Sequence, residues 1–133
     1  MRGRMREQDK IGRLLKKLTN STLQTFPIPR GRLEAPTGRG VYVIYGPKGG
    51  VEHVGSTPWA KNGLSQRLKD HLAGRSSYTV KCFDGAGEKL RGRYTFRCLE
   101  IEDGRTRALL EALAIGQLCP RHIGHGHSAD VLS

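Results

Sequence analysis

The sequence predicts an α+β domain in which a small antiparallel sheet of about three strands is flanked by helices. Three observations support this fold class. A basic amphipathic pattern with helical spacing covers residues 7–19. Two short runs rich in β-branched and aromatic residues, 40–45 and 51–55, are joined by a glycine-rich turn. An apolar run of helical length covers 104–118, so helices and a small sheet must pack together.

A basic amphipathic helix is the first expected element. Its apolar residues recur at helical spacing: Ile11, Leu14, Leu15 and Leu18. The cations between them are Arg13, Lys16 and Lys17. These cations either contact a phosphate backbone or form an ordinary solvated face. Prolines then make residues 26–30 extended, and a loop over 32–39 leads to the compact domain, which we expect to begin near Gly40.

A β-hairpin is expected after this loop. Residues 40–45 and 51–55 have the composition of strands, and the glycines and proline between them form a turn. If the turn occupies 46–49, Tyr42 lies directly opposite His53, and opposed residues share one face of a sheet. A slip of one residue would place the two side chains on opposite faces.

A helix is expected over residues 63–73, with Asn62 as its cap. Its buried stripe consists of Leu64, Leu68 and Leu72. The next segment, 75–92, is polar and rich in glycine, so we expect a loop there with Tyr78 and Phe83 as its anchors.

A strand and a last helix complete the domain. Residues 94–101 alternate in the manner of a strand. Asp103 can cap a helix over 104–118, and Pro120 closes it. This helix is apolar nearly all round, which predicts that it is buried.

The chain divides into three parts on these grounds: a basic helix and loop over 1–39, the compact domain over 40–122, and a tail over 123–133. His122, His125 and His127 alternate with glycine near the tail, a composition that can bind a metal ion. A tail of this composition is more often simply flexible.

The charge of the chain favours a polyanionic partner. The 133 residues carry 23 Lys and Arg against 12 Asp and Glu, a formal net charge of +11. The first 40 residues hold ten of these cations and three of the acids. Each phosphate that a cation neutralises releases a condensed counterion, so nucleic acid is the expected partner. Solubility, an anionic membrane surface, a ribosome-associated role and passive coating of DNA are the competing explanations.

Composition also bears on the compartment. No apolar stretch is long enough to cross a bilayer, and no apolar segment follows the basic start. We therefore expect a cytoplasmic protein without membrane association.

The cysteines are Cys82, Cys98 and Cys119, and they form no C-x-x-C pair. We expect reduced thiols that behave as half-buried small hydrophobic residues.

An ordered set of short motifs carries the clearest functional signal. Gly40-Val-Tyr42 is followed, after ten residues, by His53-Val-Gly55 and Ser56-Thr57. A helix bearing Arg67 and His71 comes next, then Leu109-Leu-Glu111 and Pro120-Arg-His122. This order resembles the GIY-YIG nuclease superfamily over roughly Gly40 to Arg121. It is most similar to the single-domain members and to the restriction-endonuclease branch. Each motif is weak alone, and their order around a turn-rich hairpin is the specific feature.

The resemblance implies a divalent-metal-dependent endonuclease that hydrolyses DNA phosphodiester bonds. It also implies a role for each matching residue. Tyr42 matches the first tyrosine of the family, and His53 stands where a second tyrosine is usual. Arg67 matches an arginine that contacts the scissile phosphate, and His71 matches a histidine of the restriction branch. Glu111 matches the glutamate that binds a single Mg²⁺ or Mn²⁺.

Elementary chemistry fits these residue types. A hard divalent cation held by one carboxylate and several waters acts as a Lewis acid. The guanidinium of Arg67 offers a planar fork of donors to phosphate oxygens. Tyrosine, with a reference pKa of about 10, and histidine, at about 6.5, are the candidate general bases. The residues alone do not rank Tyr42, His53 and His71 for that task.

Each of these residues has an ordinary alternative explanation. Glu111 follows Arg107 by four residues, so the two side chains are positioned for a helical ion pair. Arg67 fits a solvated helix position, and Tyr42 fits simple strand packing. Tyr78 and Trp59 could stack on bases, but anchoring in the core or in a loop is the more common role of such rings.

Two departures from the family pattern support a second function. The family commonly has an asparagine shortly after the Pro-Arg of the last motif, where this chain has Ile123, and His53 replaces a tyrosine. The alternative is therefore a catalytically degenerate GIY-YIG-like module that binds nucleic acid without cutting it. A structural role in a ribonucleoprotein is a third, more distant explanation.

No separate recognition domain is evident in the sequence. We assign phosphate contacts to five cations: Arg13, Lys16, Lys17, Arg39 and Lys69. DNA is the expected partner, and RNA is not excluded because no reader of the 2′-hydroxyl is visible. We expect either weak sequence specificity, or specificity supplied by a homodimer or a second protein.

Overall fold

The computed structural model describes residues 6–57 and 63–124. Its strands are β1 (Gln24–Thr25), β2 (Gly40–Tyr45), β3 (Val51–Ser56) and β4 (Thr95–Glu100). Its helices are α1 (Glu7–Thr19), α2 (Leu64–Leu72), α3 (Ser77–Phe83) and α4 (Gly104–Leu118), with a short 3₁₀ helix over Gly87–Leu90. The α+β class is confirmed, but the sheet has four strands rather than about three. None of these helices, within the described ranges, is long and apolar enough to cross a membrane.

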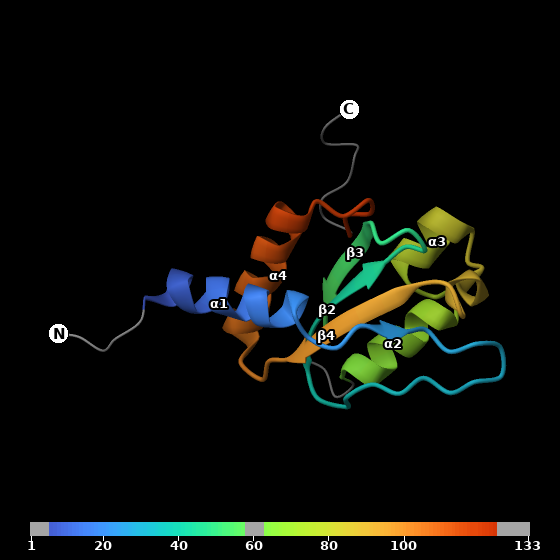
Figure 1. The fold of residues 1–133 in the computed structure, drawn as a ribbon, viewed down its shortest axis with the longest axis horizontal. Coiled ribbons are helices and arrows are strands. Elements are labelled where there is room, and N and C mark those ends of the chain that lie inside the picture. The colour runs from blue at the N-terminus through green and yellow to red at the C-terminus, as the bar shows by residue number, and fades with distance from the viewer. Residues whose placement is uncertain (1–5, 58–62, 125–133) are drawn as a thin grey trace.

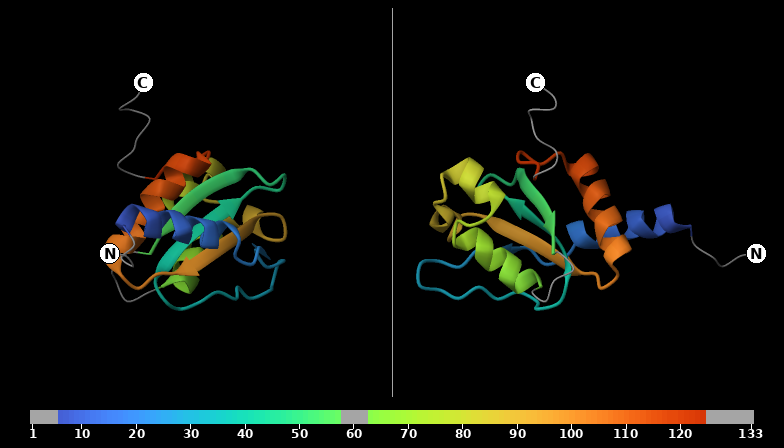
Figure 2. Two further views of the ribbon diagram at one scale, coloured as in Figure 1. Left: turned by 60° about the vertical axis from the view of Figure 1, so that its left-hand side comes forward. Right: turned by 180° about the vertical axis from the view of Figure 1, so that it is seen from behind.

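The sheet is antiparallel and has the strand order β1-β4-β2-β3, so β3 is an edge strand. Helices lie on both faces (Figures 1 and 2). Val41 and Val43 of β2 face the core shared with α1 and α4, whereas Tyr42 and Ile44 face the core shared with α2 and α3. The period-two alternation of a strand therefore sends β2 side chains into two separate hydrophobic cores.

Segments that precede Gly40 contribute to both of these cores. Leu18, in α1, is fully buried in the core beneath α4. Phe26 is fully buried in the opposite core, where its ring lies 4.9 Å from that of Phe96. The fourth strand, β1, just before Phe26, has two residues paired with β4. A two-residue strand beside prolines has no periodicity to detect, which explains why the sequence did not predict it.

The register of the hairpin differs from the predicted one. Tyr42 pairs with Gly55, and His53 pairs with Ile44, so the prediction that Tyr42 faces His53 directly is wrong. Two causes add up. The turn is one residue longer than assumed, since Tyr45 pairs with Val51, and the register shifts once more between Ile44 and Tyr45. The total slip of two residues is even, so Tyr42 and His53 still share one face, with their rings 5.9 Å apart.

The segment over 75–92 is not the loop that the sequence predicted. It contains α3 and the 3₁₀ helix, and the hydroxyl of Ser76 accepts a hydrogen bond from the backbone N–H of Thr79 at the start of α3. A helix of seven residues is too short to give a clear 3.6-residue pattern, whereas its serine cap was readable. The expected cap of α2, Asn62, lies outside the described residues. Gly63 stands at the N-cap position of that helix.

Helix α4 has the predicted bounds and the predicted cap. Asp103 Oδ2 accepts from the backbone N–H of Thr106 at 2.9 Å. The prediction that this helix is buried holds for one side of it, because Leu110 and Ala114 are buried while Ala108 and Ala112 are exposed. Small apolar residues on the exposed side form a wall of a cavity rather than part of the core.

All three cysteines are free thiols, and the expectation that they are half-buried holds for Cys82 and Cys98. Cys119 is exposed instead. It follows the last turn of α4 with a φ of 47°, and its backbone N–H donates to the carbonyl of Ile115. This left-handed cap turns the chain away from the helix, and the side chain stays in solvent.

Gly55 is required by the close approach of the Tyr42 ring. A Cβ at position 55 would lie 2.6 Å from Tyr42 Cζ and 3.1 Å from Cε1. We predict that Gly55→Ala lowers the free energy of unfolding by about 1–3 kcal/mol, because a well-packed ring must shift. Urea denaturation followed by circular dichroism measures this. Gly50→Ala is the matched control, since no atom lies within 4 Å of its added Cβ. Equal losses in the two variants would contradict the packing argument.

Candidate active site at the edge of the sheet

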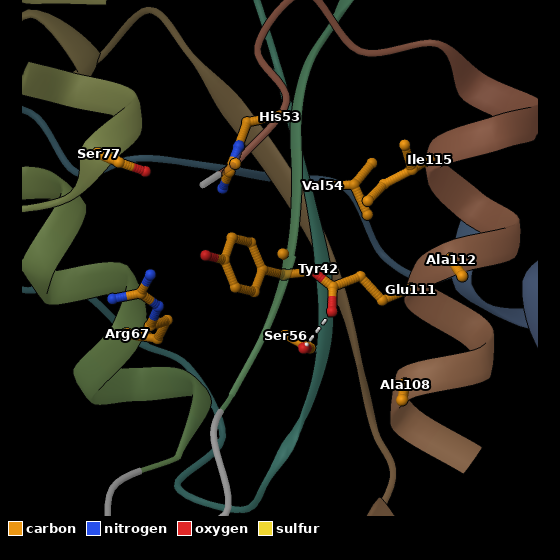
Figure 3. A pocket seen from close by; sticks show the side chains of 12 residues that line it. Tyr42, His53, Val54, Ser56, Arg67, Ser77, Ala108, Glu111, Ala112 and Ile115 are labelled. Atoms are coloured by element: carbon orange, nitrogen blue, oxygen red, sulfur yellow. Dashed lines mark hydrogen bonds between the residues drawn. The ribbon is translucent and has the colours of Figure 1, made fainter. Parts of the chain in front are cut away.

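A cavity of about 530 Å³ lies at the edge strand β3 and is lined from both faces of the sheet. Figure 3 shows Arg67 and Ser77 on one side, Tyr42 and His53 in the middle, and Glu111 of α4 on the other side. Among the described residues β3 is the last strand on this side of the sheet, so α2 and α4, which cover opposite faces, both reach the cavity. The fold therefore brings together four of the five residues predicted as catalytic.

Tyr42 forms the floor of this cavity although its side chain is fully buried. Its hydroxyl is 2.7 Å from His71 Nε2. Burial raises the pKa of Tyr42 well above its ordinary value, and the nearby positive charge of Arg67 opposes that rise. Tyr42 is therefore a neutral phenol near neutral pH, hydrogen-bonded on the side away from the cavity.

His71 does not line the cavity. Its side chain is fully buried behind Tyr42, and its second nitrogen, Nδ1, lies 2.6 Å from the hydroxyl of Ser76. Burial holds the pKa of His71 well below the ordinary histidine value, and the neighbouring His53 and Arg67 act in the same direction. His71 can therefore influence the cavity only through the rings that cover it, which are Tyr42, hydrogen-bonded to it, and His53, whose ring centroid is 5.2 Å from its own. Ser76 was not singled out in the sequence for this contact.

His53 reaches the cavity and is paired with a second histidine. Its Nδ1 lies 3.1 Å from Nδ1 of His122, and the two residues are 5% and 7% exposed. Burial lowers the pKa of His53 to about 3, and the adjacent His122 adds to this effect. The chain after α4 returns along β3, because the backbone N–H groups of Arg121 and His122 donate to carbonyls of that strand. The two sites at which this chain departs from the family pattern, His53 and the residues after Pro-Arg, are thus adjacent in space.

Tyr78 anchors this histidine pair and is unavailable for stacking on a base. Its ring is fully buried and stacks on His53 with a centroid distance of 5.1 Å and an interplanar angle of 5°. Its hydroxyl donates to Glu52 Oε1 at 3.0 Å, which also accepts from Arg121. The core-anchoring interpretation of Tyr78 is confirmed, while Trp59 lies outside the described residues.

Arg67 projects from α2 into the cavity (Figure 3). Its nearest carboxylate is that of Asp70, with a long N–O distance of 3.9 Å. Its Nε is buried and has no hydrogen-bond partner among the described residues. Within this part of the chain the guanidinium is therefore held only by a long ion pair, and its charge is suited to an incoming anionic oxygen.

Glu111 lies across the cavity from Arg67. Its Oε1 accepts a hydrogen bond of 2.6 Å from the hydroxyl of Ser56. The ordinary alternative, an ion pair with Arg107, is not formed in the part of the chain that the structure describes. Arg107 instead donates to the carbonyls of Ile101 and Glu102, at 3.0 and 2.7 Å. Ser56 was missed as a site residue, although it directly follows the His53-Val-Gly55 motif.

The donor set of the cavity suits a hard divalent cation rather than a zinc-type centre. Across residues 6–57 and 63–124, no group of three or more His, Cys, Asp or Glu side chains could hold a metal ion together. Mg²⁺ and Mn²⁺ accept a single carboxylate together with water and substrate oxygens. Glu111 offers such a carboxylate beside the Ser56 hydroxyl. Of the tail histidines, His125 and His127 lie outside the described residues.

The cations assigned to phosphate contacts lie outside this cavity. Arg13, Lys16 and Lys17 are exposed on α1, which packs against α4. Lys69 borders a separate depression on the side of α2 away from Arg67. Arg39 forms an ion pair with Glu102 at 3.4 Å. The structure therefore does not bring these five cations together with the residues that line the cavity.

Comparison with known proteins adds no assignment. No protein-family model matches the chain, and no curated protein matches it. The resemblance to GIY-YIG nucleases therefore stays a prediction from the sequence motifs.

Stability should fall on acidification because His53 is buried without a charge. Its pKa drops from 6.5 to about 3 on folding. Below pH 6.5 the unfolded chain binds a proton that the native protein excludes, so this contribution to stability is complete above that pH and is lost as the pH falls. A shift of one pKa unit corresponds to about 1.4 kcal/mol, so His53 alone should lower the free energy of unfolding by on the order of 2 kcal/mol between pH 7 and pH 5.

Urea denaturation of wild type and His53→Gln at several pH values tests this prediction. We expect a shallower loss of stability in the variant between pH 7 and pH 5. Parallel curves in this range would show that His53 is not buried as a neutral group. The range from pH 7 to pH 9 is the internal control, since histidine does not titrate there and the two curves should run parallel.

Proposed function

We propose that this chain is a divalent-metal-dependent endonuclease that hydrolyses DNA phosphodiester bonds, in the manner of GIY-YIG nucleases. One observation carries the proposal. Tyr42, Arg67 and Glu111 come from β2, α2 and α4, which are far apart in the sequence, yet all three line one open cavity. A guanidinium facing a carboxylate across such a space matches what an anionic phosphate and its counter-cation require.

The residues have separable tasks in this proposal. Arg67 binds a phosphate oxygen, because its guanidinium faces the cavity and the ion pair that it forms with Asp70 is long, at 3.9 Å. Glu111, oriented by Ser56, holds the divalent cation. When bound, that cation supplies Lewis acidity, which neutralises charge on the phosphate and on the departing oxygen. In the overall reaction the oxygen of water bonds to phosphorus as the ester P–O bond breaks, and the departing oxygen gains a proton.

The non-cutting alternative also has an observation in its favour. The side chain of Tyr42 is fully buried, and His53 has its pKa lowered to about 3, so neither residue is a strong base in this conformation. A pure binding module, however, has no need for a carboxylate such as Glu111 in the same cavity as Arg67. A structural protein of a ribonucleoprotein has no need for it either. We therefore favour the enzyme.

Supercoiled plasmid DNA incubated with Mg²⁺ or Mn²⁺ tests the enzyme directly. We predict that wild type nicks or linearises the plasmid and that EDTA abolishes the reaction. Glu111→Gln, which keeps the shape of the side chain but removes its charge, should lower the rate at least about 100-fold. Arg67→Lys should also be slow, because an ammonium group cannot replace the planar fork.

Glu88→Gln is the matched control, since it neutralises an exposed glutamate on the 3₁₀ helix and should cut like wild type. Binding of DNA at low salt without cutting under any metal would overturn the enzyme and support the binding module. Cutting by Glu111→Gln at the wild-type rate would remove Glu111 from the site.

Phosphate contacts by α1 predict a salt dependence. Neutralising two contacting cations should flatten the slope of log K against log salt concentration by about 1 to 2, since each phosphate contributes about 0.9. We expect this change in Lys16→Gln/Lys17→Gln, measured by fluorescence anisotropy on a DNA duplex. Lys89→Gln, on the 3₁₀ helix, is the control. An unchanged slope in the double variant would remove α1 from the interface.

A further inference from the structure

A buried chain of hydrogen bonds runs from the Tyr42 hydroxyl away from the cavity and into the start of α3. Tyr42 Oη is 2.7 Å from His71 Nε2, and His71 Nδ1 is 2.6 Å from Ser76 Oγ. Ser76 Oγ is in turn 2.9 Å from Thr79 Oγ1. The side chains involved are at most 3% exposed, so water does not compete for these contacts.

Two further contacts fix the direction of this chain. The backbone N–H of Thr79 donates to Ser76 Oγ at 3.2 Å, as a helix cap. The hydroxyl of Thr79 donates to the backbone carbonyl of Ser76 at 3.2 Å, and a carbonyl can only accept. These two bonds and the three above make five contacts.

Five protons are available for them. Tyr42, Ser76 and the Thr79 hydroxyl each have one, the Thr79 amide has one, and a neutral imidazole has one. Since Thr79 gives its hydroxyl proton to the carbonyl, Ser76 must donate to Thr79 Oγ1. Ser76 then has no proton left for His71, so Nδ1 of His71 must donate to Ser76. Nε2 is therefore unprotonated and accepts from Tyr42. No other assignment makes all five contacts hydrogen bonds.

We propose that Ser76 and Thr79 are positioning residues that hold His71 in its Nδ1–H tautomer, so that Tyr42 donates its proton to Nε2 and turns a lone pair towards the cavity. The neutral state of the imidazole agrees with the effect of burial, which lowers the pKa of His71. The position of Arg67 agrees as well, because the positive charge of its guanidinium counteracts the raised pKa of Tyr42.

The tautomer decides whether Tyr42 can accept a proton. In the Nδ1–H form, the phenol oxygen takes a proton from the attacking water while its own proton passes to His71 Nε2. Water then becomes the hydroxide that bonds to phosphorus, Tyr42 stays a neutral phenol, and His71 becomes a transient imidazolium. The departing oxygen takes up a proton as the ester bond breaks, and His71 returns to the neutral form by passing its Nε2 proton back to Tyr42. In the opposite tautomer Tyr42 would point its proton into the cavity and could only donate. This catalytic consequence rests on the proposed nuclease activity, whereas the tautomer itself does not.

The tautomer can be measured without any substrate. Long-range ¹H–¹⁵N correlation spectra of protein labelled with ¹⁵N-histidine distinguish the two neutral forms, and His71→Gln assigns the signal. We expect the Nδ1–H form in wild type. In Thr79→Val, Ser76 loses the oxygen that accepts its proton and donates to His71 Nδ1 instead, so the tautomer should invert. Thr79→Ser restores the hydroxyl and should restore the wild-type form.

Val80→Thr, at an exposed position of the same helix, is the matched control and should leave the tautomer unchanged. An Nε2–H form in wild type overturns the proposal even if the valine variant fails to fold. An unchanged tautomer in folded Thr79→Val also overturns it, because Ser76 and Thr79 would then not set the proton position.

The catalytic consequence has its own readout. With plasmid cutting as the assay, kcat should fall at least about 10-fold in Thr79→Val, while KM stays within about twofold because Arg67 and Glu111 are untouched. Thr79→Ser should cut like wild type. An inverted tautomer with unchanged kcat would overturn the role in proton transfer. If wild type does not cut DNA at all, the proposed function fails, while the spectra still decide the tautomer.

Discussion

The packing of the Tyr42 ring against Gly55 is the contact on which the candidate site depends. It places an aromatic ring against an edge strand, where only a residue without a side chain leaves room. The ring is thereby buried, and its hydroxyl stands between a cavity on one side and His71 on the other. A larger residue at position 55 would displace the phenol from both neighbours.

The position of β3 at the edge of the sheet has an equally direct consequence. A central strand would separate the two layers of helices, and α2 could not share a cavity with α4. At the edge, Tyr42 and His53 from one face meet Ser56 and Glu111 from the other. The cation of Arg67 and the carboxylate of Glu111 can then lie on opposite sides of a single space, which a phosphate and a divalent cation could fill together.

Electrostatics in this region favour neutral rings near a permanent cation. His53, His71 and His122 all have lowered pKa values, chiefly because of burial. Arg67 retains its charge and depresses the pKa of His53 and His71 further. Neutral imidazoles can each donate and accept one hydrogen bond, so in the resting protein they orient the protons of their neighbours without adding charge to the cavity.

The sequence by itself determined the elements with strong local signals and the residue types of the site. The apolar and capped pattern of α4, the β-branched run of β2 and the order of Tyr42, Arg67 and Glu111 were all readable, because they depend on neighbours in the chain. Only the tertiary structure decided the register of the hairpin, which a longer turn and a local shift moved by two residues. It also decided that His71 lies behind Tyr42, that Ser56 contacts Glu111, and that His122 meets His53. These contacts join residues 29 to 69 positions apart, and their geometry follows from how two helical layers close around an edge strand, which no local pattern encodes.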